Sequence, residues 1–589
     1  MSGTRKPNVF FIVIDDMGWD DIGYQSTDLK GITPNLDKLA AGGVKMTNYY
    51  SMSICTPARA TLMTGRYPVR YGMQYDDVIT PGQPWGVPLS EKLLPEYLND
   101  AGYESHMVGK WHLGGYSSEH LPSQRGFDTY KGYLGGAERY WSRNSMEVIM
   151  EGGRTFVDFG FGNATGYFDI TERPINAEGV SPDRRGLDLK RQYSTDEFQA
   201  RTLEVTATRR GLVSSSFDSE NCMSQRLAGL YETFLLCCPR KTVPILAAKS
   251  PHDEKPLFMY LAHQAVHKPL GLPPDGSFTE EEVELLDAVG QRDTDDIQGN
   301  TRRWFAEVAM YLDKKVGELV GLLEKEGWLE NSIIVVASDN GGDPGAGGSN
   351  YPLRGMKHTY WEGGMKASLW SRRPPAGKVP AFVYSKSHIP EEARGTEYHG
   401  LMHVADWLPT IATEHLLICS GHAGALDGVN QWSHIVDPAL AHADEAGENY
   451  PRTEILHNFD PYVLLSDPNE EIDPLQAQSQ GAYRYGKYKM HFSVFCQGWY
   501  TNDKQVLAQA SRQDPLTDLA NVCGGTCDPD GSCGGDDDDE EPLDRLYDIE
   551  ADPRETTNLI DDLPDVAQEL RDRWYNVTFQ EYSDTVYRP

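Results

Sequence analysis

Short apolar runs alternate with segments of helical periodicity over most of the chain. A continuous run of β-branched and aromatic residues at 9–14 predicts a strand buried on both faces, and the apolar runs at 257–262 and 333–337 predict two more strands. Residues 103–108 are interpreted as a further strand. Apolar residues at helical spacing predict helices between them, near residues 34–41, 94–101 and 304–326. Strands separated by helices favour an α/β fold with a mostly parallel sheet and right-handed crossovers.

The pattern changes toward the end of the chain. Residues 483–492 alternate like one half-exposed strand, residues 546–549 suggest another short strand, and residues 565–582 have helical spacing. We therefore expect two domains. The larger is an α/β domain over residues 1–450, and the smaller is a C-terminal α+β domain over residues 451–589, with a small antiparallel sheet and a terminal helix.

Composition limits the classes of partner. The 589 residues include 54 Lys and Arg against 88 Asp and Glu, which gives a net charge of −34. Nucleic acids and anionic membranes attract proteins with excess positive charge, so neither is an expected partner. The apolar runs are all shorter than the roughly 18 residues of a membrane span, so no membrane-spanning helix is expected.

Residues 1–7 lack the apolar stretch of a signal peptide. On the sequence as given the chain is expected to be cytoplasmic. If the amino terminus is truncated, a secretory, lysosomal or extracellular location is expected instead. The sequons at Asn163 and Asn576 would then be glycosylation sites of a glycoprotein.

Reactive side chains follow four of the predicted strands. In chain order they are Asp15 and Asp16, Lys110 and His112, His263 and His267, and Ser338, Asp339 and Asn340. Ligands bind beyond the carboxyl ends of the strands in open parallel sheets, so these groups are expected to meet at one edge. One such Asp pair alone is better explained as a helix cap or turn, but four strands ending this way favour a binding site.

The acidic strand ends offer oxygen ligands only. The set comprises three carboxylates and one amide, from Asp15, Asp16, Asp339 and Asn340. Such ligands suit a hard cation, and the irregular mixture favours Ca²⁺ over Mg²⁺. The nearby Asp20 and Asp21 are interpreted as structural loop residues.

A cysteine motif lies between the first two predicted strands. Residues 55–65 read Cys-Thr-Pro-Ala-Arg-Ala-Thr-Leu-Met-Thr-Gly. Pro57 suits the first turn of a helix, which places Cys55 at a helix N-terminus, where the dipole favours negative charge. By residue type alone, Cys55 could also be a buried core thiol.

The Cys-x-Pro-x-Arg motif followed by Thr64-Gly65 resembles the signature of the type I sulfatases, of the alkaline-phosphatase-like superfamily. Gly109-Lys110-Trp111-His112-Leu113-Gly114 is similar to the second signature of that family. Further similar segments cover most of the chain in order, at residues 126–128, 264–267, 338–342, 352–357, 361–364, 403–410, 455–458, 546–549 and 552–553. The resemblance implies an alkaline-phosphatase-like α/β fold and a sulfuric ester hydrolase of the arylsulfatase type.

The resemblance also implies a modified nucleophile and a metal. In this family the signature cysteine is oxidised to Cα-formylglycine, whose hydrated form attacks sulfur, so Cys55 is the expected nucleophile. A formylglycine-generating enzyme, which reads Pro57 and Arg59, is the implied maturation partner. One Ca²⁺ per chain is implied, held by Asp15, Asp16, Cys55, Asp339 and Asn340.

The basic residues are implied to act on the ester. Lys110 and Lys357 would clamp the sulfate, and Arg59 would brace the nucleophile. His112 would serve as a base toward the nucleophile, and His267 would assist the leaving alcohol. The implied substrate is a sulfated glycan or an aryl sulfate. His263 is interpreted as structural.

Two other functions stay open: a phosphoester or phosphonate hydrolase of the same superfamily, and a non-catalytic sulfoglycan-binding protein with an unmodified Cys55. Segments 204–250 and 368–378 match nothing in the family and are interpreted as insertions or misread exon boundaries. Cys523, Cys527 and Cys533 favour a disulfide or a loop over a metal site, because no fourth ligand accompanies them.

Overall fold

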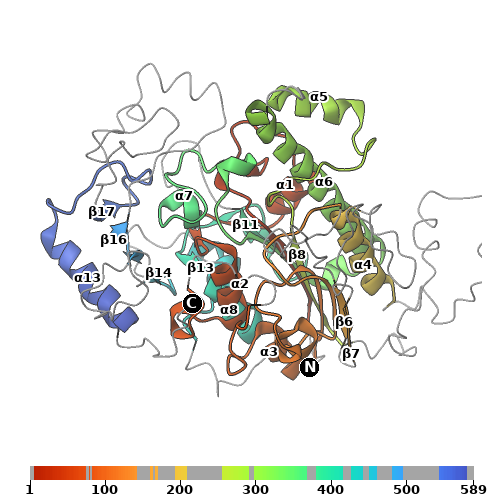
Figure 1. Ribbon diagram of the computed structural model, residues 1–589, viewed down its shortest axis with the longest axis horizontal. Coiled ribbons are helices and arrows are strands. Elements are labelled where there is room, and N and C mark those ends of the chain that lie inside the picture. Colours follow the sequence, from red (N-terminus) through yellow and green to blue (C-terminus); the bar gives the residue numbers. More distant parts are fainter. Residues whose placement is uncertain are drawn as a thin grey trace, which may run out of the picture.

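A large central sheet with helices on both faces forms the body of the protein (Figure 1). The computed structural model describes residues 5–74, 79, 83–141, 160–163, 166–169, 193–208, 255–290, 297–367, 380–414, 426–441, 450–460, 480–494 and 543–579. Segment 204–250 beyond residue 208, segment 368–378 and the cysteines at 523, 527 and 533 lie outside these ranges, so the expectations for them stay untested.

Five central strands run parallel: β9 (Ser332–Ser338), β1 (Asn8–Ile14), β8 (Leu257–His263), β4 (Glu104–Lys110) and β5 (Thr129–Tyr133). The flanking strands are β11 (Ala381–Tyr384), β2 (Val44–Met46), β12 (Glu397–Tyr398), β6 (Gly160–Asn163) and β7 (Gly166–Asp169). The order is β12-β2-β11-β9-β1-β8-β4-β5-β6-β7, and antiparallel pairs occur only toward the edges. Ile14 pairs with both His263 and Ser338, so β1, β8 and β9 end at the same level.

Alternate residues of β1 enter two separate apolar cores. Residues 9, 11 and 13 pack in the core with α2 (Cys55–Thr64), α3 (Leu94–Asp100) and α8 (Trp407–Glu414). Residues 10, 12 and 14 pack in the core with α1 (Pro34–Ala41), α4 (Ser194–Thr208) and α6 (Ile297–Lys325). Burial on both faces is what an uninterrupted apolar strand predicts, and the expected α/β architecture is confirmed.

Shorter elements complete this body. The body also contains the helices α5 (Glu280–Val289), α7 (Glu362–Met365), α9 (Trp432–Val436) and α10 (Pro438–Ala441). A three-stranded sheet has the order β10 (Lys366–Ala367), β3 (Tyr49–Tyr50) and β13 (Met402–His403). Within the described ranges, every helix is too short or too polar to cross a membrane.

The tail forms an antiparallel sheet of four strands: β14 (Glu454–Asp460), β15 (Gln480–Tyr485), β16 (Tyr488–Val494) and β17 (Leu543–Asp548). The final helix, α13 (Pro564–Phe579), packs on it, and the Trp574 ring stacks on Phe492 with 4.0 Å between centroids (Figure 1). These elements are of the kinds expected for residues 451–589, and the domain boundary itself stays a prediction.

The interpretation of residues 483–492 as one strand is wrong. The chain reverses between β15 and β16, where Gly486 has a φ of 55° that suits a residue without a side chain. The apolar positions move from odd to even numbers across this glycine, from Tyr483 and Tyr485 to Tyr488 and Met490. That change of phase marks a hairpin turn, because one strand keeps its alternation unbroken.

Candidate active site

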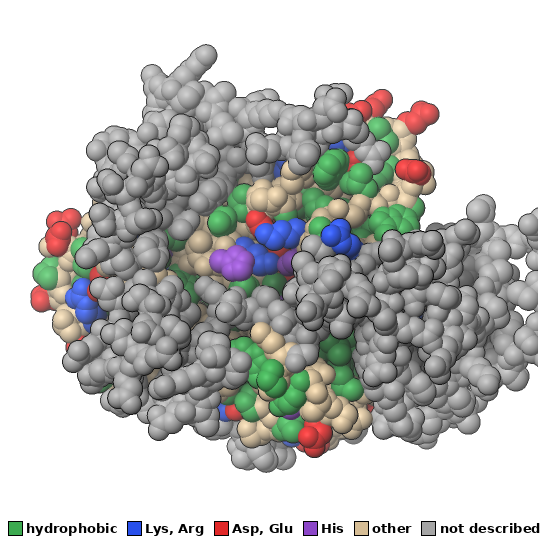
Figure 2. Space-filling model, in the orientation of Figure 1, with side chains coloured by type: hydrophobic (Ala, Val, Ile, Leu, Met, Phe, Trp, Pro, Cys, Tyr) green, Lys and Arg blue, Asp and Glu red, His purple; other side chains and the backbone are tan. Residues whose placement is uncertain are grey.

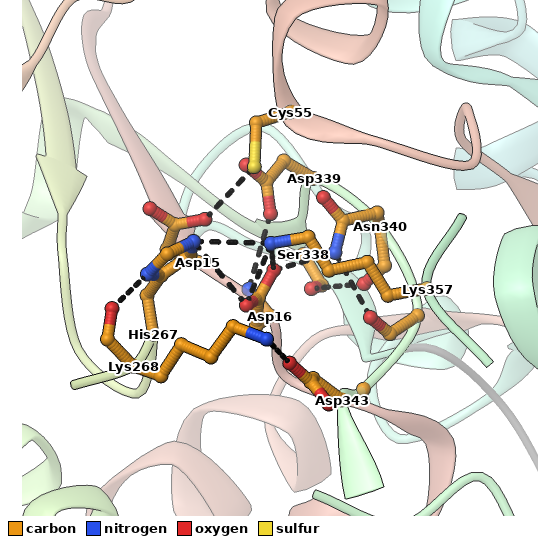
Figure 3. A network of polar contacts seen from close by, with 12 residues as sticks. Asp15, Asp16, Cys55, His267, Lys268, Ser338, Asp339, Asn340, Asp343 and Lys357 are labelled. Carbon is orange, nitrogen blue, oxygen red and sulfur yellow. Dashed lines mark hydrogen bonds and ion pairs between the residues drawn. The ribbon is translucent and has the colours of Figure 1, made fainter. Parts of the chain in front are cut away.

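The carboxyl ends of neighbouring strands bring the predicted residues together (Figure 3). Asp15 and Asp16 directly follow β1, and Asp339 directly follows β9. Asp16 has a φ of 64°, a left-handed conformation that Asp tolerates better than most residues. Its backbone N–H donates to Asp339 Oδ1 at 3.2 Å, which joins the ends of the two strands. The expected convergence at one sheet edge is therefore present.

Cys55 is the first residue of α2, as the motif predicts, and its side chain points into this cluster (Figure 3). The sulfur lies 3.5 Å from Asp15 Oδ1, and the residue is buried. Burial raises the pKa of the thiol to about 12, although Lys110 and Lys357 oppose the rise. The helix N-terminus thus places the sulfur at the site without making the unmodified thiol a thiolate.

Three buried cations pair with the carboxylates of the cluster. Lys110 Nζ donates to Asp15 Oδ2 at 2.7 Å. Lys357 Nζ lies 2.7 and 2.8 Å from the two oxygens of Asp16. Arg59 donates from two nitrogens to Asp339 Oδ2, at 2.8 and 3.1 Å. The residues implied to bind the ester are thus charged groups inside the site rather than surface charges.

The paired carboxyls differ in their proton affinity. Burial, with the neighbouring charge of Asp339, raises the pKa of Asp15 to about 7. Burial acts in the same direction on Asp16, but His267 and Lys357 outweigh it and hold the pKa of that carboxyl below its usual range. Two adjacent residues therefore carry acids of different strength.

The two implied acid–base histidines differ in their contacts. His267 Nε2 is 3.0 Å from Lys357 Nζ and 3.5 Å from Asp16 Oδ2, and its Nδ1 contacts the backbone oxygen of Lys268. An ammonium group only donates, so Nε2 accepts and Nδ1 carries the proton in this arrangement. His112 is buried, and neither ring nitrogen has a hydrogen-bond partner among the described residues. Burial lowers the pKa of both rings, that of His267 to about 3.

The donor set fits a cation. Asp15, Asp16, Cys55 and His267 each present a ligand atom, and these four atoms all lie within 4.8 Å of one another. Asn340 donates its amide hydrogens to Asp16 Oδ1 and Gly341 O, and its buried Oδ1 has no hydrogen-bond partner in the part of the chain that the structure describes. A buried acceptor of this kind needs a ligand, and a hard cation would supply one.

Positive side chains also gather near the centre of the face drawn in Figure 2, although the chain as a whole is strongly acidic. The side chain of Lys268, next to His267, is 57% exposed. Its Nζ lies 2.6 Å from Asp343 Oδ2 (Figure 3). The sequence reasoning missed this ion pair. The place of Lys268 directly after His267 could have indicated it, whereas Asp343 comes close only through the loop after β9.

Asp20, Asp21 and His263, interpreted from the sequence as structural, make contacts that hold the fold rather than the site. Asp21 accepts from the backbone N–H groups of Gly18 and Ser349 and pairs with Arg302. Asp20 accepts from Thr27. His263, the last residue of β8, is buried and has Phe198 against its ring. None of these three contributes an atom to the cluster around Cys55 that the described residues form.

Comparison with known proteins agrees with the motifs. The family model described as "Sulfatase" matches residues 7–413. Arylsulfatase J of Mus musculus is 34% identical over 463 residues, which are 78% of this chain and 59% of the relative, so the chain matches less than two thirds of that protein. Arylsulfatase A of Bos taurus is 27% identical over 97% of this chain and 86% of the relative.

A solved structure has a similar fold. The crystal structure of Ps i-CgsB in complex with k-i-k-neocarrahexaose superposes with a TM-score of 0.63 at 22% identity, covering 99% of this chain and 95% of that one. This similarity confirms the alkaline-phosphatase-like α/β fold expected from the sequence. The family match extends through the four strand ends, the cysteine motif and the loop of Lys357. The chain belongs to the sulfatase family.

Proposed function

We propose that the protein hydrolyses sulfate esters through a formylglycine formed at position 55, with one Ca²⁺ at the adjacent carboxylates. The observation that carries this proposal is the meeting of Arg59, Lys110 and Lys357 with the Cys55 side chain in one buried cluster. Three cations around one nucleophile position suit an ester that carries negative charge.

The chain's own residues bind and orient that ester. Lys110 and Lys357 would exchange part of their contact with Asp15 and Asp16 for contact with sulfate oxygens. Arg59, fixed by Asp339, would hold the side chain at position 55 in place. His112, whose ring nitrogens have no hydrogen-bond partner among the described residues, would accept a proton from the nucleophile. His267 Nε2, which accepts the hydrogen bond of Lys357, would pass the proton received from that ammonium group to the leaving oxygen.

Two groups complete this chemistry. Formylglycine at position 55 would supply, as its hydrate, a hydroxyl nucleophile that a buried thiol does not provide. Ca²⁺ held by Asp15, Asp16, Asp339, Asn340 and the side chain at position 55 would supply positive charge toward a sulfate oxygen. Maturation would require a formylglycine-generating enzyme as a transient partner.

A sulfated glycan is the proposed substrate class, ahead of a small aryl sulfate. The sequence motifs also resemble those of arylsulfatase B, which is N-acetylgalactosamine-4-sulfatase, and this narrower resemblance supports the choice. The relatives named above are arylsulfatases J and A, so the particular sugar stays a prediction.

The proposal is tested by assaying the matured protein side by side on an aryl sulfate and on the matching aryl phosphate. We expect higher kcat/KM for the sulfate, and loss of that activity in Cys55→Ala. Faster turnover of the phosphate would support the phosphoester or phosphonate hydrolase instead. Tight binding of a sulfated oligosaccharide with no turnover, in protein of verified maturation, would support the non-catalytic binding function.

A further inference from the structure

Glu555 lies in the turn after β17 and contacts both ends of the loop that carries Lys357. Its Oε2 accepts a hydrogen bond from the backbone N–H of Glu362 at 2.7 Å. Its backbone oxygen accepts one from Arg354 Nη1, also at 2.7 Å. The loop itself is closed by a hydrogen bond from Gly363 N to Arg354 O at 2.6 Å. A residue almost 200 positions away in sequence therefore holds the two ends of this loop together.

The Glu555 carboxylate is held by the small C-terminal sheet. Its Oε1 lies 3.0 Å from Lys489 Nζ and 2.8 Å from His491 Nε2, and both of these residues are on β16. Lys489 also binds Glu362 Oε1 at 2.9 Å, so one ammonium group joins the sheet to both carboxylates. All four side chains are completely buried. Breaking such a pair is costly, because it leaves an uncompensated buried charge.

The turn that presents Glu555 has a defined backbone. Glu555 has a φ of 54°, which is uncommon for a residue with a side chain. Asp552 fixes the turn, since its carboxylate accepts from the backbone N–H groups of Thr556 and Thr557 at 2.7 Å each. A conformation of this kind persists where surrounding contacts determine it. In this turn those contacts are the hydrogen bonds to Asp552 and the hydrogen bond of Glu555 to the loop.

The loop between these ends places Lys357 within narrow limits. Lys357 Nζ is 2.7 Å from Asp16 and 3.0 Å from His267 Nε2. The loop has other anchors near its centre, where Lys357 N donates to Gly342 O at 3.2 Å and His358 N donates to Ser53 O at 2.9 Å. A shift of about 1 Å in the loop would lengthen both side-chain contacts beyond hydrogen-bond distance.

We propose that Glu555 is a positioning residue, which couples the C-terminal sheet to the site by fixing the loop that carries Lys357. The inference rests on the proposed function for its kinetic consequence only. It gives a role to the segment after β17, which the chemistry at Cys55 does not use. The C-terminal region is then required for activity and not only for stability.

The test compares Glu555→Gln, which keeps the shape but removes the charge, with Trp574→Phe, which alters the stacking of Trp574 on Phe492 in the same C-terminal region. Hydrogen exchange of residues 354–363 is measured in both proteins at equal distance below their melting temperatures. We expect faster exchange in this loop for Glu555→Gln only. Exchange unchanged from wild type, or raised equally by Trp574→Phe, would overturn the proposal.

Kinetics then test whether Glu555 acts through Lys357. Misplacement of a binding group by about 1 Å can cost on the order of 100-fold in rate, so Glu555→Gln should lose at least about tenfold in kcat/KM on an aryl sulfate. In a Lys357→Ala background the same change should cost less than about twofold, because its target is gone. Independent, multiplying losses in the double variant would overturn the assignment.

Two further outcomes stay distinguishable. If Glu555→Gln does not fold, Arg354→Lys keeps a buried positive charge but removes the guanidinium contact to Glu555 O, and the same two measurements apply. If the wild-type protein turns over no sulfate ester, the proposed function fails, and hydrogen exchange of the loop alone decides whether Glu555 holds it.

Discussion

Lys110 Nζ lies 2.7 Å from Asp15 Oδ2, and both side chains are completely buried. Burial lowers the pKa of Lys110, but the charge of Asp15 outweighs this effect and the net shift is upward. At neutral pH this upward shift favours the charged form of Lys110. An isolated buried ion pair is weak evidence for stability. Its position beside Cys55 is better explained by a need for positive charge at the site.

Replacing either lysine of the site should reduce turnover strongly. On the proposed function, Lys110→Ala and Lys357→Ala would each remove a charge-assisted hydrogen bond to the sulfate, worth roughly 1.5–3 kcal/mol. This corresponds to a loss of about 10- to 150-fold in kcat/KM. Steady-state kinetics on an aryl sulfate measure the loss, with Lys386→Ala, at the surface, as the control. Wild-type kinetics in both site variants would exclude these lysines from substrate binding.

Removal of a predicted ligand should affect both metal and activity. Asp339→Ala and Asp16→Ala should abolish turnover and weaken Ca²⁺ retention. Asp339→Ala also leaves the buried guanidinium of Arg59 without its principal partner, so we expect a loss of about 3–5 kcal/mol in unfolding free energy. Metal analysis and denaturant unfolding of the purified variants test these effects. Full activity with unchanged metal content would remove that residue from the ligand set.

Asp15 and Asp339 could be predicted because each follows a strand-length run of mostly apolar residues. Asp15 and Asp339 lie one residue beyond strands whose every residue is buried, so local pattern located them. Lys357 could not be found this way, because it lies in a loop between two short elements with no periodicity. Only the motif resemblance singled it out, and its contact with Asp16 spans 341 residues of sequence.

The strand that was predicted wrongly and the contacts that were not predicted have a similar cause. The turn at Gly486 left a phase change in the sequence, but the alternation on both sides suggested one strand. The approach of Asp343 to Lys268 and the contacts of Glu555 with the loop of Lys357 depend on tertiary structure. Periodicity reports which face of an element is buried, and not which distant side chain meets it there.

Buried histidines should make the protein less stable in acid. Burial, with the nearby charge of Arg452 for His403 and of Lys489 for His457, holds the pKa of both rings well below the ordinary value of 6.5. In the unfolded chain both rings take up protons below about pH 6.5. Their contribution to stability is therefore complete above that pH and is lost as the pH falls toward the folded pKa.

Melting temperatures between pH 7.5 and 5 test this expectation. His457→Asn should flatten the decline relative to wild type, whereas His434→Asn, at a partly exposed position, should not. Asp313 acts in the opposite direction, because burial raises its pKa to about 6, but it does so equally in all three proteins. Identical pH slopes in His457→Asn and wild type would contradict the assignment to this ring.

The decisive prediction concerns the chemical state of position 55. A sulfur 3.5 Å from Asp15 could belong to a thiol enzyme or to the precursor of an aldehyde enzyme, so position alone does not distinguish them. The aldehyde requires that sulfur be lost and a carbonyl gained. Peptide mass spectrometry of active protein should therefore show formylglycine at this position, and activity should rise with the modified fraction when a formylglycine-generating enzyme is co-expressed.

Pro57→Ala provides a matched variant, because it keeps Cys55 but alters the motif that the maturation enzyme is expected to read. Pro57 lies in the first turn of α2, where a helix tolerates either residue, so the fold should persist. We expect a lower modified fraction and a proportional loss of activity, with unchanged activity per modified molecule. Cys55→Ala should fold and show no turnover. If fully active protein carries an unmodified thiol at Cys55, the formylglycine mechanism does not operate here, and the proposed sulfate ester hydrolysis should be withdrawn with it.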